Sequence, residues 1–209
     1  MSLHAAPRHP DAQALALALA EAGLIQFGRF AHPDGTTWPL LVRLRWLPSY
    51  PALLHDVAAA LARALDGALA DRLLPTQDAI PLGVALSLHT GLPMAYPSNE
   101  ARAYTTALAI EGAYDVGHPT LLLADVLDDA AHAQRLTALA RRVGLDVGDV
   151  LAVLDLGRGA SAQLAANGYR VGTLFALPDL LGPFVEAGLL TPTMRAVIAG
   201  WLDGVRPSR

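Results

Sequence analysis

The chain has 209 residues, enough for one α/β domain with a sizeable core and too few for two ordinary domains. Hydrophobic residues make up 53% of it, with 40 Ala and 39 Leu, and charged residues 16%, so the chain is globular rather than disordered or collagen-like. All 15 basic residues are Arg, and there is no Lys or Cys, which excludes Schiff-base lysines, the P-loop lysine, disulfides, thiolate nucleophiles and cysteine-ligated zinc.

The net charge of −4 offers no uniform electrostatic attraction to nucleic acid or anionic lipid. The uncharged stretch from Ala12 to Ala20 is far shorter than the roughly 20 apolar residues of a membrane span. Its shortness and Asp11 also argue against a signal peptide, although Arg8 precedes it. We therefore expect a cytoplasmic protein that binds neither nucleic acid nor membrane.

Residues 11–50 predict a helix followed by a small hood. Residues 1–10 carry two prolines and no apolar periodicity and are expected to form a loose tail. Asp11 can cap a helix that runs to about Ala22. Residues 24–45 then alternate apolar runs around a Pro-Asp-Gly turn, which is typical of a hairpin.

The rest of the chain predicts an α/β fold. Pro51 suits the first position of a helix that extends to Gly67. From Leu73 onward, short apolar runs alternate with helical patterns, which favours a central, mainly parallel sheet flanked by helices. The predicted strands are residues 93–96, 120–126, 150–156 and 171–177, and the predicted helices are residues 82–90, 131–143, 160–167, 178–187 and 192–202. We expect a single domain over residues 1–209.

Several motifs follow one another in a characteristic order. The first series comprises Phe27-Gly28-Arg29-Phe30, Asp34-Gly35-Thr36-Thr37-Trp38-Pro39 and Arg45. The second comprises residues 93–112, with Glu100, Ala101, Tyr104, Ile110, Glu111 and Gly112, then residues 120–126 and 150–181. In order and spacing these motifs resemble the orotate phosphoribosyltransferases, which have the type I phosphoribosyltransferase fold with an N-terminal hood.

The resemblance implies positions for the ligand-binding residues. The segment Ala124-Asp125-Val126-Leu127-Asp128-Asp129-Ala130-Ala131 stands where the family has Asp-Asp-Val-x-Thr-Thr-Gly-Gly, the phosphoribosyl pyrophosphate (PRPP) motif. By resemblance, Asp125 would contact the ribose, and Asp128 and Asp129 occupy the loop that wraps the 5′-phosphate. Arg102, Tyr104 and Arg45 are the other ligand-binding positions carried over from the family.

The chain departs from the family where the family binds its substrates. The loop that supplies Arg and Lys to pyrophosphate reads Ser98, Asn99 and Arg102, and residues 72–78 lack the glycine of the family's other pyrophosphate loop. The family's Asp-Arg pair, whose Arg reaches orotate, is Asp155-Leu156. We therefore expect the pyrophosphate and orotate sites to be altered together.

Two carboxylates replace the phosphate loop. In the family, glycines let backbone N–H groups approach the phosphate at a helix N-terminus. Here Asp128 or Asp129 can cap that helix through its own oxygen. A phosphate beside them meets repulsion of about 1 kcal/mol per charge pair even in bulk water. The sequence thus predicts that PRPP binding is lost.

These observations leave three functional hypotheses. The first is a phosphoribosyltransferase-like pseudoenzyme of nucleotide or pyrimidine metabolism, acting as a binding or regulatory subunit with a protein partner. The second is an active, divergent phosphoribosyltransferase that uses PRPP, Mg²⁺ and a nucleobase other than orotate, with Asp125 on the ribose and Arg102 on pyrophosphate. The third is a dinucleotide-binding protein, since residues 157–162 read G-x-G-x-x-A, with Asp179 about 20 residues on.

Metal binding and assembly complete the expectations. The seven His residues show no i, i+4 pair, and the acids at 125, 128 and 129 are interpreted as a helix cap with solvated neighbours rather than a cation site. We therefore predict no resident metal. The aromatic residues Phe27, Phe30, Trp38, Trp46 and Trp201 suit the core or a subunit interface, and with the family resemblance they favour a homodimer.

Overall fold

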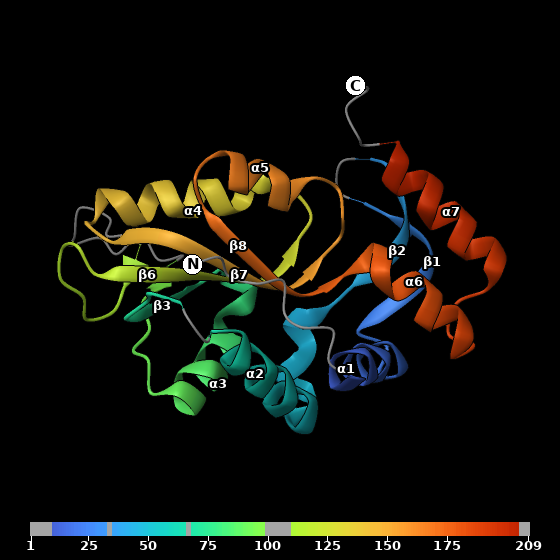
Figure 1. Cartoon of the computed structure of the whole chain (residues 1–209), viewed down its shortest axis with the longest axis horizontal. Coiled ribbons are helices and arrows are strands. Elements are labelled where there is room, and N and C mark those ends of the chain that lie inside the picture. Colours follow the sequence, from blue (N-terminus) through green and yellow to red (C-terminus); the bar gives the residue numbers. More distant parts are fainter. Residues whose placement is uncertain (1–9, 33–34, 66–67, 99–109, 205–209) are drawn as a thin grey trace.

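A parallel sheet of four strands runs through the middle of the molecule (Figure 1). The computed structural model describes residues 10–32, 35–65, 68–98 and 110–204. The strands are β3 (Arg72–Pro75), β6 (Pro119–Leu127), β7 (Asp146–Asp155) and β8 (Arg170–Ala176), in the order β3-β6-β7-β8. The predicted α/β fold with a central parallel sheet is confirmed.

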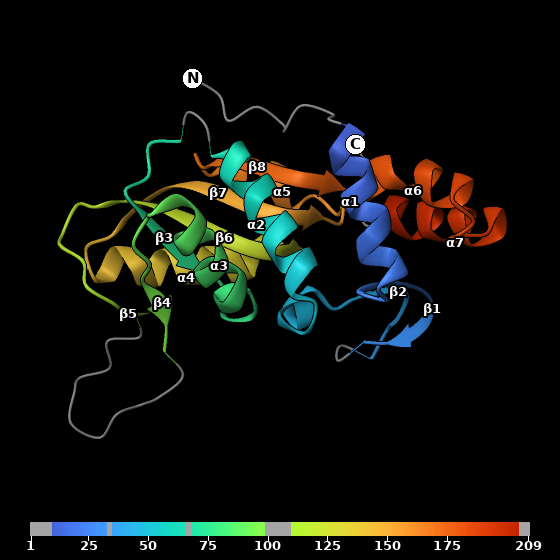
Figure 2. The same cartoon turned by 90° about the horizontal axis from the view of Figure 1, so that it is seen from below.

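Helices cover both faces of this sheet because its strands are apolar on both sides. Along β6, Leu121 and Leu123 face one core and Leu122 and Ala124 face the other. The first core is shared with α1 (Pro10–Glu21), α2 (Pro51–Ala64) and α3 (Ile80–Thr90), and the second with α4 (Ala130–Arg142) and α5 (Ala160–Ala166). Figure 2 views the molecule from the side of α1, α2 and α3, which lie in front of the sheet.

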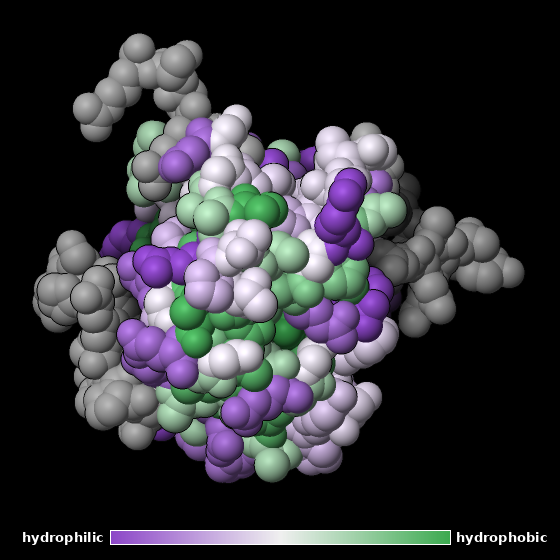
Figure 3. All heavy atoms as spheres, turned by 90° about the vertical axis from the view of Figure 1, so that its right-hand side faces the viewer, coloured by the Kyte–Doolittle hydropathy of each residue, from purple (hydrophilic) through white to green (hydrophobic). Residues whose placement is uncertain are grey.

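The N-terminal hood is the predicted hairpin. It consists of β1 (Ile25–Ala31) and β2 (Thr37–Val42), which pair antiparallel and lead into the 3₁₀ helix η1 (Leu44–Ser49). Of the predicted turn, Pro33 and Asp34 lie outside the described residues. The hood packs on the last two helices, α6 (Leu177–Glu186) and α7 (Pro192–Asp203). Seen from the side of α6 and α7, hydrophobic residues gather in the middle of the face with hydrophilic residues around them (Figure 3).

A cationic side chain joins the hood to the last helix. The guanidinium of Arg158 lies 4.6 Å from the ring centroid of Trp38, on β2, and 4.6 Å from that of Trp201, on α7. The two indole rings are 5.0 Å apart. Each such cation–π contact contributes about 0.5–2 kcal/mol, so the cluster helps to fix the hood over the sheet. Of the aromatic residues singled out in the sequence, Trp46 remains 45% exposed.

Several predicted boundaries were wrong. The first helix begins at Pro10, one residue before its expected cap at Asp11, and residues 1–9 lie outside the described part of the chain, as does Gly67. The run 93–96 is not a full strand of the main sheet. Only an isolated parallel bridge joins Met94 to Leu73, because Pro93 has no N–H to donate to a ladder.

The two residues after that bridge pair elsewhere. Tyr96–Pro97 (β4) forms a short antiparallel pair with Ile110–Glu111 (β5). Gly112, which follows β5, has a φ of 135°, and a Cβ there would lie 3.0 Å from the Cα of Ala95. Glycine is therefore required at the end of this pair.

Candidate functional site

A cleft of about 690 Å³ lies at the carboxyl ends of β3 and β6. The chain leaves β3 toward α3, on one face of the sheet, and leaves β6 toward α4, on the other. Because these two connections diverge, the ends of β3 and β6 leave a crevice between them, which is the position where ligands bind in open α/β sheets. The fold itself therefore places the candidate site here.

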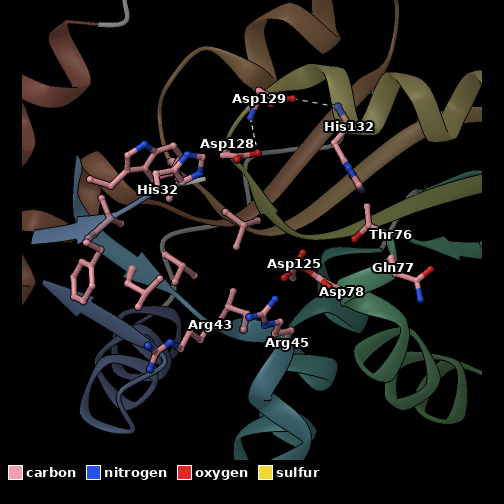
Figure 4. A pocket seen from close by; sticks show the side chains of 18 of the residues that line it. His32, Arg43, Arg45, Thr76, Gln77, Asp78, Asp125, Asp128, Asp129 and His132 are labelled. Carbon is pink, nitrogen blue, oxygen red and sulfur yellow. Dashed lines mark hydrogen bonds between the residues drawn. The ribbon is translucent and has the colours of Figure 1, made fainter. Parts of the chain in front are cut away.

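Three parts of the chain supply the polar lining of the cleft (Figure 4), and Leu156, after β7, adds an apolar side chain. The floor comes from the turn after β3 and from β6, one wall comes from the start of α4, and the hood and η1 form the opposite side. The polar lining residues are Thr76, Gln77, Asp78 and Asp125 on the floor, Asp128, Asp129, His132 and Arg135 on the wall, and His32, Arg43 and Arg45 on the hood side.

Asp129 caps helix α4 with its own side chain. Its Oδ1 accepts hydrogen bonds from the backbone N–H groups of Ala131, at 2.8 Å, and His132, at 3.1 Å. This confirms the predicted cap and assigns it to Asp129. Asp128 instead accepts from the N–H of Asp129, at 2.7 Å. Two N–H groups at the helix N-terminus are thus already bonded to a carboxylate. Without that carboxylate, the same N–H groups would attract an anion.

Asp125, at the end of β6, is ionised less readily than an ordinary carboxyl. Burial is the main cause that raises its pKa from 3.8 to about 6, and the nearby charge of Asp78 raises it further. Backbone hydrogen bonds, from Val126 among others, and the charge of His132 partly offset this rise in pKa. A group that donates hydrogen bonds to Asp125 would favour its ionised form.

Thr76 lines the same cleft floor as the carboxyl of Asp125. It follows β3 directly, is only 4% exposed, and its hydroxyl has no hydrogen-bond partner in the described structure. The residue lines the cleft (Figure 4), although the hydroxyl oxygen itself is buried. The sequence analysis noted this segment only for its missing glycine, and neither Thr76 nor Asp78 was predicted as a site residue. Their position after an apolar strand that ends at a sheet edge was the available signal.

The cations of the cleft are arginines. Arg45, one of the predicted ligand-binding residues, is exposed on η1 and lines the cleft. The guanidinium of Arg43 lies over the ring of Trp46, 4.5 Å from its centroid. Arg102 and Tyr104, the other two predicted ligand-binding residues, lie outside the described residues. The structure therefore brings together Arg45, Asp125 and the two acids at 128 and 129.

The glycine-rich turn after β7 is held by hydrogen bonds to the last residue of that strand. The carboxylate of Asp155 accepts from the N–H of Gly157, at 2.8 Å, and from the hydroxyl of Ser161, at 2.5 Å. A Cβ at Gly157 would lie 2.7 Å from Pro178, so this turn is packed against α6. Asp179 lies in the first turn of α6, not at the end of a strand as the dinucleotide fingerprint requires.

Over residues 10–204, apart from the gaps at 33–34, 66–67 and 99–109, no three His, Asp or Glu side chains are grouped to hold a metal ion. In the same ranges no helix is both long and apolar enough to cross a membrane.

Sequence comparison identifies relatives of this chain. No protein-family model matches it. It is 30% identical over 169 residues to the orotate phosphoribosyltransferase of Halobacterium salinarum, an alignment that covers 80% of this chain and 95% of the relative. It is also 26% identical over 175 residues to a bifunctional PyrF/PyrE enzyme of Nostoc, covering 83% of this chain but only 37% of the relative.

Solved structures show the same relation. The UMP synthase of Leishmania donovani superposes with a TM-score of 0.84 at 28% identity, over 92% of this chain and 42% of that one. The orotate phosphoribosyltransferase of Francisella tularensis superposes with a TM-score of 0.72 at 17% identity, over 91% and 98%. The chain spans about two fifths of the PyrF/PyrE enzyme and of the UMP synthase, and nearly the whole of the two orotate phosphoribosyltransferases. This protein belongs to the orotate phosphoribosyltransferase family and has the type I phosphoribosyltransferase fold.

Proposed function

We propose that this chain is a member of the family without PRPP-dependent catalysis, which acts as a binding or regulatory subunit. The observation that carries the proposal is the side-chain cap on α4. Asp129 bonds to the N–H groups of Ala131 and His132, at the helix N-terminus that follows β6. By resemblance, this is where the family's loop holds the 5′-phosphate. A phosphate dianion would have to displace a carboxylate and remain beside it, which electrostatic repulsion opposes.

The charge of the whole cleft supports the same proposal. Four carboxylates line it, at positions 78, 125, 128 and 129. Among the residues that the structure describes, three arginines also line it, Arg43, Arg45 and Arg135, and the guanidinium of Arg43 lies over the ring of Trp46. Among the described residues, a ligand as anionic as PRPP would therefore meet more negative than positive charge in this cleft.

The base-recognition position is altered as well. Leu156 lines the cleft at the end of β7, where by resemblance the family has an Arg that reaches orotate. Its side chain is apolar and only 2% exposed, and the neighbouring Asp155 is occupied by Gly157 and Ser161. Neither side chain offers a cation to a carboxylate of a base.

A pyrophosphate-release assay tests the proposed loss of catalysis. The purified protein is incubated with PRPP and Mg²⁺ and with orotate, uracil, adenine or guanine in turn, beside an authentic orotate phosphoribosyltransferase. We expect pyrophosphate release at the background rate with every base. Release that depends on one base and on enzyme concentration would overturn the proposal.

The second candidate function, an active divergent phosphoribosyltransferase with Mg²⁺, is the positive outcome of that assay. It is supported by Asp125, which is retained at the end of β6, and by Arg45 in the same cleft. In this function Asp125 would position the ribose, Arg102, which lies outside the described residues, would face pyrophosphate, and Arg45 and Arg135 would add positive charge. The surplus of carboxylates makes this the less favoured function.

We also propose that the chain forms a homodimer, within pyrimidine-nucleotide metabolism in the cytoplasm. Four large apolar side chains stand exposed on η1 and α3 or just beside them, and η1 packs against α3. They are Trp46, Tyr50, Val84 and Leu88, with exposures of 45%, 37%, 43% and 84%. Exposed apolar residues gathered in this way are typical of a subunit interface.

A further inference from the structure

A histidine contacts a buried arginine at the amino end of the sheet, opposite the cleft. Arg72 begins β3 and is only 6% exposed, and its Nη2 lies 3.3 Å from Nδ1 of His118, which directly precedes β6. No carboxylate is paired with Arg72 in the described part of the chain, and its Nε has no hydrogen-bond partner there. Arginine stays charged at physiological pH and is rarely buried without a carboxylate. The imidazole of His118 is therefore the polar partner of this buried cation.

The contacts of His118 fix which of its ring nitrogens carries the proton. The backbone N–H of Asp115 also donates to Nδ1, at 3.2 Å. A guanidinium and a backbone N–H can only donate hydrogen bonds, so Nδ1 must be the acceptor and can carry no hydrogen. The ring is then neutral, with its proton on Nε2. A protonated ring carries hydrogens on both nitrogens and could accept neither bond.

The same ring holds the turn of residues 113–118, which connects β5 to β6. The bond from Asp115 to Nδ1 closes the turn on itself, and the bond from Arg72 joins it to β3. Next to His118, the N–H of Gly117 donates to the carbonyl of Gly144, at 2.7 Å. Loss of the Nδ1 acceptor would therefore open the turn and detach it from the buried arginine.

One arginine and three aspartates lie around His118. Arg72 opposes a second positive charge 3.3 Å away. Asp115 attracts one, since its Oδ2 lies 3.9 Å from Nε2, but its side chain is 92% exposed, so water screens that attraction. Asp71 and Asp146 are exposed, and their backbone N–H groups bond to carbonyls at the start of β6. A protonated ring would thus face a buried cation, while its compensating carboxylates stand in water.

We propose that His118 is a pH-sensitive latch, which holds the 113–118 turn against Arg72 while its ring is neutral and releases the turn when the ring is protonated. Histidine ordinarily changes its charge between pH 5 and 8, so the release occurs at mildly acidic pH. It opens a buried guanidinium to water and to anions at the end of the sheet opposite the cleft. The latch does not depend on whether the cleft binds PRPP.

Amide hydrogen exchange measured by NMR at pH 7.5 and pH 5.5 tests this proposal. Rates are expressed as protection factors, so that the intrinsic pH dependence of exchange cancels. We expect the protection of the Asp115 and Gly117 amides to fall roughly tenfold at pH 5.5, and nitrogen shifts to show the proton of His118 on Nε2 at pH 7.5. Equal protection at both pH values, or a proton on Nδ1 at pH 7.5, overturns the inference.

Substitutions at His118 separate the two states of the latch. His118→Asn places an amide oxygen near the position of Nδ1, where it can accept both bonds and does not titrate, so the turn should stay protected at both pH values. His118→Ala offers no acceptor and should lose the protection at both. His89→Gln, at an exposed position of α3, is the matched control and should respond as wild type does. Loss of protection at pH 5.5 in His118→Asn overturns the inference, even if His118→Ala fails to fold.

Asp125 titrates in the same pH range and must be separated from His118. Its pKa is about 6, because burial raises it, but it lies at the other end of β6. In Asp125→Asn the protection of the Asp115 and Gly117 amides should still fall at pH 5.5. A response that disappears in Asp125→Asn would assign it to the cleft and overturn the latch.

Discussion

At the scale of single residues, Asp125 makes the stability of the fold depend on pH. Its pKa is about 6 in the folded chain against 3.8 ordinarily, so the folded state holds the proton more tightly than the unfolded chain. Stability therefore falls as pH rises from about 4 to about 6, and the full loss persists above pH 6. Below both pKa values the carboxyl is protonated in either state and contributes no difference.

Asp125→Asn removes this pH-dependent loss. Its free energy of unfolding should exceed that of wild type by about 1–3 kcal/mol at pH 8 and should match it near pH 3.5. Urea denaturation at the two pH values measures the difference. Asp146→Asn, exposed at the start of β7, is the control and should change little at either pH. A gain of equal size at both pH values would show that packing, and not ionisation, is responsible.

Local chemistry made some site residues predictable and left others hidden. The cap at Asp129 follows from a short stretch of sequence, because a capping side chain bonds to N–H groups two and three residues later. Thr76 is different, because its burial depends on β6 and η1, which are distant in the sequence and pack beside the turn after β3. No local pattern contains that information.

At the scale of elements, an ion pair ties β7 to β8. Asp149 and Arg170 are directly paired in the sheet, and the carboxylate accepts from Nε and Nη2 at 2.6 Å each. This hydrogen bond, with the charge of Asp149, raises the pKa of Arg170 above its ordinary value. The Asp149 side chain is 3% exposed and that of Arg170 38%, so the two partners are buried unequally.

That inequality predicts unequal effects of substitution. Arg170→Ala leaves a buried carboxylate without its partner and should lower the free energy of unfolding by about 2–3 kcal/mol. Asp149→Asn leaves Arg170 partly in water and should lower it by about 1 kcal/mol. Urea denaturation at pH 7 compares the two variants. A larger loss in Asp149→Asn than in Arg170→Ala would contradict this view of the pair.

Elements with long apolar runs were predicted from the sequence more easily than elements with short ones. The long runs in β6 and β7 are buried on both faces, which makes them visible as strands in the sequence. β3 spans only Arg72–Pro75, and its strand character depends on pairing with β6, more than 40 residues away. The run 93–96 is as apolar as a strand, but the proline at its start limits it to a single bridge with β3.

At the scale of the whole molecule, the exposed apolar residues of η1 and α3 predict association. Sedimentation velocity of the wild-type chain at about 50 μM should give a dimer. Leu88→Asp puts a charge at an exposed position of α3 and should shift the protein to monomer. Val197→Asp, at an exposed position of α7, is the matched control and should remain dimeric. A monomeric wild type, or a dimeric Leu88→Asp variant, would exclude this interface.

The structure of the whole chain also explains how a protein can keep its family's fold while its substrate-binding residues differ. The fold depends on dozens of buried residues in two cores, and these retain the family's scaffold, including a structural match over 92% of the chain. Substrate binding depends on a few side chains at one edge of the sheet, and substitutions there leave the cores untouched. Family membership was therefore visible in the order of the motifs, while the chemistry of the cleft depends on the few residues that line it.

Calorimetric titration of PRPP with Mg²⁺ tests the loss of PRPP binding most directly. The wild-type chain is compared with Asp128→Thr/Asp129→Thr, in which a threonine hydroxyl can still cap α4 while both charges are removed. We predict no binding heat for the wild type and measurable binding for the double variant. Wild-type binding at micromolar affinity, about −8 kcal/mol, would contradict the loss of PRPP binding.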